Sequence, residues 1–362
     1  MAPSSKPPIK VLVVDDSAVT RMYLTHLLES DPQIRVIGNV SNGQSALDFI
    51  KEQLPDAVLM DINMPGMDGF EATRRIMETQ PVPIIICTAA MNPKEVAITF
   101  RVLEAGAVAC VEKPVSPEHP DYTVLSANLL QTIKLMSEVR VVRRWPRSRQ
   151  VPATGTGAIQ MKRTSTDFKV VGIGASTGGP AVLQTILAGL PKDFPVPILI
   201  VQHIANGFLP GLAEWLNQTT GLKIQIAAYG TVPLPGHVYL APDGFHMGLS
   251  SHGRLLLTKE EPENGLRPAV SYLFRSLAEV CASEAVGVLL TGMGKDGASE
   301  LKLMKDRGAT TFAQDRESSI VHGMPGEAIS LGGATQILPA DKIAGALATL
   351  LNKRNGEGET EL

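Results

Sequence analysis

The sequence predicts an α/β protein of two domains, each built on a mainly parallel sheet. At 362 residues the chain is longer than a typical single domain. Apolar residues make up 44% but aromatic residues only 4%, which is typical of the aliphatic cores of parallel sheets. Strand-like and helical patterns alternate along the chain, with one long interruption near its middle. We therefore expect domains at 10–142 and 168–354, a linker at 143–167, a disordered N-terminus at 1–9 and a flexible tail at 355–362.

Charge, hydropathy and cysteine content exclude several classes of protein. The net charge of −3 provides no electrostatic basis for bulk binding to nucleic acid or membranes. No apolar run approaches the roughly 18–20 residues of a membrane span, and the N-terminus carries no secretory signal. Cys87, Cys110 and Cys281 form no C-x-x-C pair, and we interpret each as a small buried apolar side chain. We expect a cytoplasmic protein without nucleic-acid partners or direct membrane insertion.

The first domain contains five strand–helix units. Predicted strands cover 10–16, 35–40, 56–61, 83–89 and 107–114. The predicted helices that follow them cover 17–30, 42–53, 69–79, 93–106 and 121–142. Because parallel strands joined by helices cross over with one hand, five such units predict a doubly wound parallel sheet. The basic stretch at 143–167 is rich in Thr, Gly and Pro and lacks periodicity, which is typical of a linker.

The second domain repeats the alternation with interruptions. Strands are expected within 168–176, 196–203, 285–292 and 310–315. Helices are expected at 181–190, 208–220, 269–281 and 296–308, with a last strand–helix unit in 335–354. Short β-like pieces separated by glycine-containing turns occupy 223–228, 237–242 and 254–259. This pattern predicts a second, parallel-sheet α/β domain.

Charged and hydroxyl-bearing residues end the strands of the first domain. Asp15 and Asp16 end the first strand, Asp61 the third, Thr88 the fourth, and Lys113 the fifth. The carboxyl ends of parallel strands meet at one edge of the sheet, where ligands bind. Clustered carboxylates repel unless a hard cation such as Mg²⁺ neutralises them. Separate helix caps and surface acids are the alternative, but five suitable residues at strand ends favour phosphoryl chemistry with Asp61 as nucleophile.

The motifs VVDDS, MDINMPGMDG, TA and KP, spread over 10–130, resemble the response-regulator receiver domain, which has a flavodoxin-like fold. The resemblance implies that Asp61 is the phosphoacceptor. The implied Mg²⁺ ligands are Asp15, Asp16, Asp61 and the carbonyl of Asn63. The implied switch residues are Thr88 and Lys113.

One position departs from the receiver pattern. Many receivers carry an aromatic residue on the last strand that turns inward when the switch threonine moves. In the stretch AVACVEKP that position falls at Cys110 or Ala109. We therefore expect phosphorylation chemistry to survive, whereas transmission of the signal through an aromatic rotamer is not expected.

The glycine-rich stretch 170–183, VVGIGASTGGPAVL, is compatible with three structures. It could be a tight strand-to-helix connection or, through the G-x-G spacing at 172–178, a dinucleotide-binding turn. A dinucleotide site needs an acid at the end of the next strand, but that strand ends in His203. The third structure is the G-x-S-x-G turn, which lifts Ser176 above a sheet and beside a helix start.

A nucleophilic serine needs a base and a group that orients the base. His203 ends the next strand, and the strand at 285–292 brings Asp296 to the same end of the sheet. The chain order Ser, His, Asp differs from the Ser, Asp, His order of α/β-hydrolases. As alternatives, His203 could be a structural hydrogen-bonding group and Asp296 a helix N-cap. The rival bases are His237, His246 and His252, whose spacing suggests no metal cluster.

The motifs GASTGGP, VQH, APDGFHM, ENGLRPAV and LLTGMGKDG occur in one register over 168–352. They resemble the catalytic domain of the chemotaxis protein-glutamate methylesterases, the CheB family. The resemblance implies Ser176 as nucleophile, His203 as general base and Asp296 as the group that orients the imidazole. It also implies that the backbone N–H of Met293 lies in the oxyanion hole. The N–H of Thr177 is a further candidate because it lies at the helix start.

The resemblance implies an enzyme that removes methyl esters from glutamates on the cytoplasmic helices of chemoreceptors, releases methanol and deamidates glutamines. Mg²⁺ in the receiver is the expected cofactor, and none is expected in the catalytic domain. A chemotaxis-type histidine kinase is the expected phosphodonor, and the receiver is expected to mask the active site until Asp61 is phosphorylated. The alternatives are a phosphorylation-dependent binding protein without esterase activity and, more distantly, a nicotinamide oxidoreductase.

Overall fold

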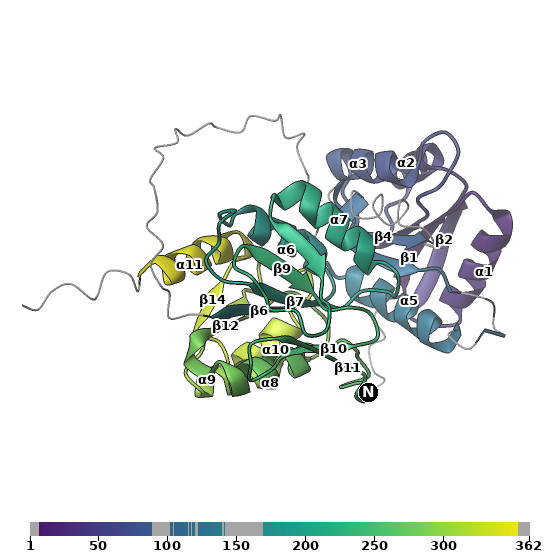
Figure 1. Cartoon of the computed structure of the whole chain (residues 1–362). Helices are drawn as coiled ribbons and strands as arrows, with labels where there is room; N and C mark the ends of the chain where they lie inside the picture. The colour runs from purple at the N-terminus through teal and green to yellow at the C-terminus, as the bar shows by residue number, and fades with distance from the viewer. Residues whose placement is uncertain are drawn as a thin grey trace, which may run out of the picture. The chain divides into compact units, whose positions relative to one another are not determined.

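The chain is described by a computed structural model, which divides into two compact units, Met1–Ser148 and Arg149–Leu362 (Figure 1). The structure describes residues 7–88, 102–103, 105–114, 116, 118–119, 122–139, 141 and 169–353. The linker predicted at 143–167 and the tail predicted at 355–362 lie outside the described residues, as do most of the predicted helix 93–106 and most of the predicted disordered stretch 1–9.

The N-terminal unit has a five-stranded sheet in the order β2-β1-β3-β4-β5. Its strands are β1 (Ile9–Val14), β2 (Ile34–Val40), β3 (Ala57–Met60), β4 (Ile84–Thr88) and β5 (Ala109–Glu112). Each neighbouring pair is parallel. The chain moves in opposite directions from β1, so the predicted doubly wound fold is confirmed. The aliphatic runs of β1, β3 and β4 lie almost entirely in the core.

The described helices of this unit are α1 (Ala18–Glu29), α2 (Gly43–Glu52), α3 (Gly69–Thr79) and α5 (Tyr122–Met136). The first three begin after residues whose side chains accept a hydrogen bond from the first helical turn, namely Ser17, Asn42 and Asp68. Helices α2 and α3 pack together on one face of the sheet, whereas α1 and α5 lie on the other (Figure 1).

The C-terminal unit has a seven-stranded parallel sheet in the order β14-β13-β12-β6-β7-β9-β8. Its strands are β6 (Val170–Ala175), β7 (Ile198–Gln202), β8 (Lys223–Ile226), β9 (His237–Leu240), β12 (Ala285–Leu289), β13 (Thr310–Gln314) and β14 (Gln336–Leu338). The strand order reverses at β6, which lies between β7 and β12. Ligands bind beside the carboxyl ends of strands at such a reversal.

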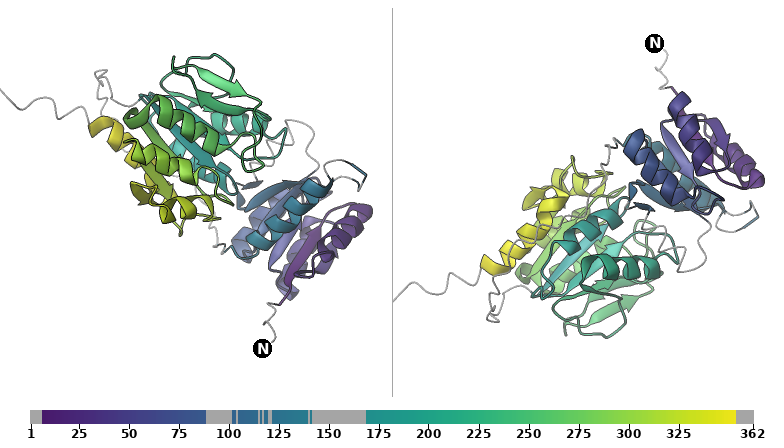
Figure 2. Two further views of the ribbon diagram at one scale, coloured as in Figure 1. Left: turned by 90° about the horizontal axis from the view of Figure 1, so that it is seen from below. Right: turned by 90° about the horizontal axis from the view of Figure 1, so that it is seen from above.

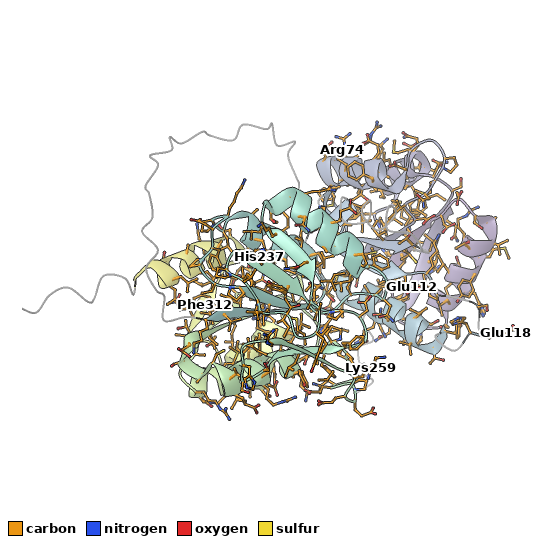
Figure 3. The ribbon with its side chains drawn as sticks, in the orientation of Figure 1. Arg74, Glu112, Glu118, His237, Lys259 and Phe312 are labelled. Carbon is orange, nitrogen blue, oxygen red and sulfur yellow. The ribbon has the colours of Figure 1, made fainter. Side chains whose placement is uncertain are left out.

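Helices cover both faces of this sheet. One face carries α6 (Gly179–Ala188), α7 (Leu209–Thr220) and α11 (Ala340–Lys353). The other carries α8 (Val270–Val280), α9 (Ala298–Asp306) and α10 (Met324–Ser330), with a short 3-10 turn at Ala282–Glu284 after α8. Figure 2 shows α6 and α7 in teal from above and the α8–α10 layer in green from below. Phe312 of β13 is buried in this core (Figure 3).

The structure shows how the short predicted β-like pieces pair and adds elements that were not predicted. The β-like pieces at 223–228 and 237–242 join the main sheet as β8 and β9, whereas 254–259 contains β11 (Leu255–Thr258), which pairs with β10 (His246–Leu249) in an antiparallel hairpin. Helix α10 was also not predicted, because its sequence MPGEAIS contains Pro and Gly, which disfavour helices. Among the described residues, no helix is long and apolar enough to cross a membrane.

Candidate functional sites

The acids of the N-terminal unit gather at the carboxyl ends of its strands. Asp15 and Asp61 follow β1 and β3 and are buried, whereas Asp16 is exposed. One carboxylate oxygen from each of the three lies within 4.8 Å of the others. The Lys113 Nζ atom lies 2.7 Å from Asp15 Oδ2 and 3.0 Å from Asp61 Oδ1. Asn63 is exposed two residues beyond Asp61, and a metal-binding role for its carbonyl stays a prediction.

Burial shapes the electrostatics of this cluster. The pKa of Asp61 is raised because burial disfavours the carboxylate, although Lys113 counteracts part of that effect. Burial would lower the pKa of Lys113, but hydrogen bonds and attraction to Asp15 and Asp61 outweigh it, so this pKa is raised. One ammonium therefore balances three neighbouring carboxylates only in part. Such an excess of oxygen ligands and negative charge suits a hard divalent cation.

The predicted switch residues lie on neighbouring strands. Thr88 is buried at the end of β4, and its carbonyl accepts a hydrogen bond from the backbone N–H of Lys113, at 3.0 Å. On β5, Ala109 is buried and Cys110 is intermediate in exposure. One interstrand backbone hydrogen bond therefore joins the two predicted switch positions, and β5 carries no aromatic side chain.

Two of the three cysteines meet the expectation of burial. Cys87 and Cys281 are buried, whereas Cys110 is only partly buried. Burial raises the pKa of the Cys87 thiol well above its ordinary value. A raised pKa leaves little thiolate at neutral pH, so Cys87 is a packing residue rather than a nucleophile.

In the C-terminal unit, Ser176 lies in the turn between β6 and α6. Its backbone N–H donates to the carbonyl of Thr291 at 3.0 Å, which ties the turn to the segment after β12. Gly178 has a φ of +78°, which a glycine adopts without strain. A Cβ atom on Gly292 would lie 2.7 Å from Ser176 Cβ. The glycines therefore allow the turn and its neighbour to approach closely, and they leave Ser176 partly exposed.

His203 occupies the position after β7 that pairs with Ser176. Ala175 and Gln202 are partners in the β6–β7 register, and the His203 N–H donates to the Ala175 carbonyl at 2.9 Å. The buried Gln202 amide reinforces this pairing, because its Nε2 donates to the carbonyls of Ser176 at 2.9 Å and His203 at 2.7 Å. The strand register thus places the serine and the histidine side by side.

Asp296 lies against both His203 and the start of α8. Its Oδ2 lies 2.9 Å from His203 Nε2, although the ring N–H is not directed well enough for an aligned hydrogen bond. The backbone N–H groups of Val270 and Ser271 donate to the same carboxylate at 2.6 and 3.1 Å. The N-cap alternative was therefore partly right. Asp296 caps α8, whereas the N-cap of α9, the helix that follows Asp296 in the chain, is Gly297.

These contacts keep Asp296 ionised. Burial would raise its pKa, but the neighbouring His203 and the N–H groups at the start of α8 outweigh that effect, so the pKa of Asp296 is lowered. Ser271 extends the network, because its hydroxyl accepts from the Gly297 N–H at 2.9 Å and donates to Glu300 at 2.7 Å. A fixed buried carboxylate beside an imidazole can hold one ring orientation and stabilise the imidazolium.

The other candidate bases make different hydrogen bonds or lie in an exposed turn. His237 Nδ1 lies 2.9 Å from the Pro235 carbonyl. The buried His246 uses both ring nitrogens, with Nδ1 accepting from the Ala269 N–H and Nε2 near the Glu261 carbonyl. His252 is exposed in a turn. Of these candidates, only His203 contacts a buried carboxylate and follows a strand next to β6.

Two backbone N–H groups beside Ser176 remain available to a ligand. Within the described part of the chain, the N–H groups of Thr177 and Met293 donate to no protein acceptor. Thr177 follows Ser176 directly, and Met293 follows Gly292, which packs against Ser176. Backbone N–H groups so placed can stabilise an oxyanion.

Sequence reasoning missed the polar residues that support these groups. They are Gln202, Ser271, Thr291 and Gln314, all buried. Gln202 and Gln314 each end a buried strand, so an amide at the end of an apolar run was the available signal. Ser271 and Thr291 gave no such signal, because their partners come from distant parts of the chain.

The two folds and their strand-end side chains define a class of protein, a response regulator in which a receiver is joined to an α/β domain with Ser, His and Asp at its switch point. Residues 11–120 match the response regulator receiver domain, and residues 171–347 match the CheB methylesterase family. The chain belongs to the CheB methylesterase family.

Relatives match the chain over nearly its full length. A protein-glutamate methylesterase/protein-glutamine glutaminase from Nitrosospira multiformis is 50% identical over 98% of this chain and 99% of its own. One of the same name from Syntrophus aciditrophicus is 53% identical, over 94% and 98%. The crystal structure of the Thermotoga maritima CheB methylesterase catalytic domain covers 51% of this chain and 98% of its own, with 43% identity and a TM-score of 0.49.

Proposed function

We propose that this chain hydrolyses the γ-methyl esters of glutamate side chains on chemoreceptors, with Ser176, His203 and Asp296 as its catalytic triad. The observation that carries the proposal is the 2.9 Å contact between His203 and Asp296, beside the Ser176 turn at the switch point of the sheet. The names of the full-length relatives support the same reaction.

In the proposed mechanism, Ser176 Oγ forms a bond to the ester carbonyl carbon while His203 takes its proton. Asp296 faces Nε2, so Nδ1 is the ring nitrogen left to act as base. The imidazole aligns with Asp296 when substrate binds, since catalytic hydrogen bonds are often poorly aligned in free enzymes. The N–H groups of Thr177 and Met293 bind the oxyanion.

Collapse of the tetrahedral intermediate breaks the bond between the carbonyl carbon and the methoxy oxygen. His203 returns its proton to that oxygen, and methanol leaves. A water molecule then attacks the acyl-enzyme, His203 again moves the proton, and glutamate and free Ser176 result. A glutamine side chain differs in its leaving group, so the same residues deamidate glutamine when His203 protonates the departing nitrogen.

The N-terminal unit would regulate this reaction. Asp15, Asp16 and Asp61, whose oxygens lie close enough to share one cation, would hold Mg²⁺ together with the Asn63 carbonyl. Bound Mg²⁺ would neutralise charge around the phosphoryl group. Asp61 accepts the phosphoryl group from a histidine kinase of the chemotaxis type, and Lys113 and Thr88 respond to it. Phosphorylation then shifts the population away from states in which the receiver covers Ser176.

Methanol release from methylated receptor tests the proposal. We expect release by the wild-type chain, stimulation by a small-molecule phosphodonor with Mg²⁺, and no stimulation of Asp61→Asn. A chain that binds receptor upon phosphorylation but releases no methanol would instead support the binding protein. That alternative is not favoured by the relatives, which carry enzyme names over nearly the whole chain.

A further inference from the structure

Thr291 connects the two halves of the proposed oxyanion hole. It is fully buried just after β12, and all its polar groups have partners. Its carbonyl accepts from the Ser176 N–H at 3.0 Å, and its N–H donates to Gln314 Oε1 at 2.8 Å. Its hydroxyl accepts from the Val321 N–H at 2.9 Å and lies 3.0 Å from the Thr177 carbonyl oxygen. One side chain thus contacts the nucleophile turn and the segment that supports it.

The single hydroxyl proton of Thr291 has two candidate acceptors, the carbonyls of Thr177 at 3.0 Å and Val321 at 3.2 Å. The Val321 carbonyl already accepts from the Gly292 N–H at 2.9 Å. The Thr177 carbonyl is closer, so the proton goes there. This hydrogen bond holds the peptide on the C-terminal side of Thr177. The peptide that carries the Thr177 N–H is held at its carbonyl, on Ser176, by Gln202 and Gly179, so the Thr291 hydroxyl fixes the backbone that follows this donor.

The backbone of Thr291 leads to the second donor. Gly292 follows it, and the Gly292 carbonyl accepts from the N–H groups of Gly323 and Met324 at 3.1 and 2.9 Å. The next residue is Met293, whose N–H donates to no acceptor among the described residues. Thr291 therefore contacts the residue of one donor through its hydroxyl and lies two residues before the other donor in the chain.

We propose that Thr291 is a positioning residue whose hydroxyl sets the distance between the N–H groups of Thr177 and Met293, so that both face one oxyanion. The inference rests on the proposed esterase function. Donors aimed at the transition state contribute only when their geometry is fixed, and a misplacement of about 1 Å costs roughly 10²-fold. The hydroxyl of Thr291 would therefore act on kcat far more than on substrate binding.

The test compares Thr291→Val, which keeps the shape and removes the hydroxyl, with Thr291→Ser, which keeps the hydroxyl. The matched control is Thr311→Val. Thr311 is also fully buried, and its hydroxyl donates to the Gly333 carbonyl at 2.7 Å and accepts from the Thr335 N–H at 3.0 Å. It lies near the amino end of β13, whereas the Ser176 turn follows the carboxyl end of β6, so the two lie at opposite ends of the parallel strands.

For each variant, kcat and KM for methanol release, the melting temperature, and the affinity for a receptor peptide with a γ-phosphonate monomethyl ester are measured. The phosphonate carries a tetrahedral anion where the oxyanion forms. We expect Thr291→Val to lower kcat and phosphonate affinity by about 10–100-fold with little change in KM. Thr291→Ser should recover most of both, and Thr311→Val should lower only the melting temperature.

Equal kcat values for Thr291→Val and Thr311→Val would overturn the inference, as would a Thr291→Val defect confined to KM. The wild-type chain and Ser176→Ala are measured in parallel. If wild type releases methanol and Ser176→Ala does not, the proposed function stands whatever Thr291→Val shows. If wild type releases none, the proposed function fails and the inference fails with it.

Discussion

His203 Nε2 lies 2.9 Å from Asp296 Oδ2, and the same carboxylate caps the first turn of α8. Asp296 therefore serves the helix and the imidazole at once. The helix N-terminus provides partial positive charge and two N–H groups that fix the carboxylate. The contact couples the stability of α8 to the orientation of His203.

The first prediction concerns the nucleophile and the base. Ser176→Ala and His203→Gln should each lower methanol release by at least about 10³-fold, because neither residue acts without the other. Ser251→Ala is the control, since Ser251 is an exposed serine in a turn. Folding is checked by circular dichroism, and activity that survives in Ser176→Ala would rule out the acyl-enzyme.

The second prediction separates the two roles of Asp296. Asp296→Asn should lower kcat by about 10²–10⁴-fold, because an amide cannot hold the imidazole in the same tautomer or balance its charge. Asp68→Asn is the matched control, because Asp68 Oδ1 caps α3 by accepting from the Glu71 N–H at 2.8 Å. A similar loss of kcat in both variants would contradict a catalytic role for Asp296.

The third prediction is the pH dependence of the stability that Asp296 provides. Because the folded-state pKa of Asp296 is lowered, its ionised form stabilises the fold. That contribution is fully present above the ordinary aspartate pKa of 3.8 and disappears as the pH falls through the lower folded value. Urea unfolding of wild type and Asp296→Asn should show a gap in stability at pH 6 that shrinks below pH 3.8. A constant gap would count against this assignment.

The fourth prediction concerns the contact between Gly292 and Ser176. A methyl group on Gly292 would lie 2.7 Å from Ser176 Cβ and also meet the Met324 sulfur. Gly292→Ala should therefore displace Ser176 and lower kcat by about 10-fold or more, since small misplacements are costly. Gly345→Ala is the control, because within the described part of the chain no atom lies within 4 Å of its added methyl in α11. It should stabilise the protein by about 0.5–1 kcal/mol. Wild-type kcat in Gly292→Ala would show that the turn tolerates the shift.

Residues at the carboxyl ends of strands could be predicted from the sequence because parallel strands meet at one edge. That rule led to Asp61 and Lys113 in one unit, which form an ion pair. It led to Ser176 and His203 in the other unit, where the structure aligns their backbones at neighbouring strand ends. The partner of Asp296 at α8 could not be predicted, because no local pattern records which distant helix start faces a carboxylate.

In the β10–β11 hairpin, β11 lies within the predicted β-like piece at 254–259, whereas β10 and the antiparallel pairing were missed. Its strands are four residues each, shorter than the window in which alternation is reliable. Residues 223–226 and 237–240 posed another limit, because their pattern predicted strands but not their parallel pairing with the main sheet.

The last prediction concerns Asp61 and Mg²⁺. Burial raises the pKa of Asp61, so its charged form is disfavoured in the folded state. Stability is then greatest below the ordinary aspartate pKa and is lost as the pH rises through the raised folded value. Without divalent cations at pH 7, Asp61→Asn should therefore melt at a higher temperature than wild type. Asp48→Asn should not, because Asp48 is exposed and its pKa is lowered by hydrogen bonds from Lys51 and Gln44.

Mg²⁺ should reverse the order of these melting temperatures. The cation binds the folded carboxylate cluster more tightly than the unfolded chain, so it should raise the wild-type melting temperature in a concentration-dependent way. Asp61→Asn lacks one of the three carboxylates and should gain less. Calorimetry with chelator and with increasing Mg²⁺ measures both effects. An equal response of wild type and Asp61→Asn to Mg²⁺ would show that Asp61 is no ligand. A lower melting temperature of Asp61→Asn than of wild type in chelator would show that the Asp61–Lys113 ion pair stabilises the fold more than the burial of the carboxylate destabilises it.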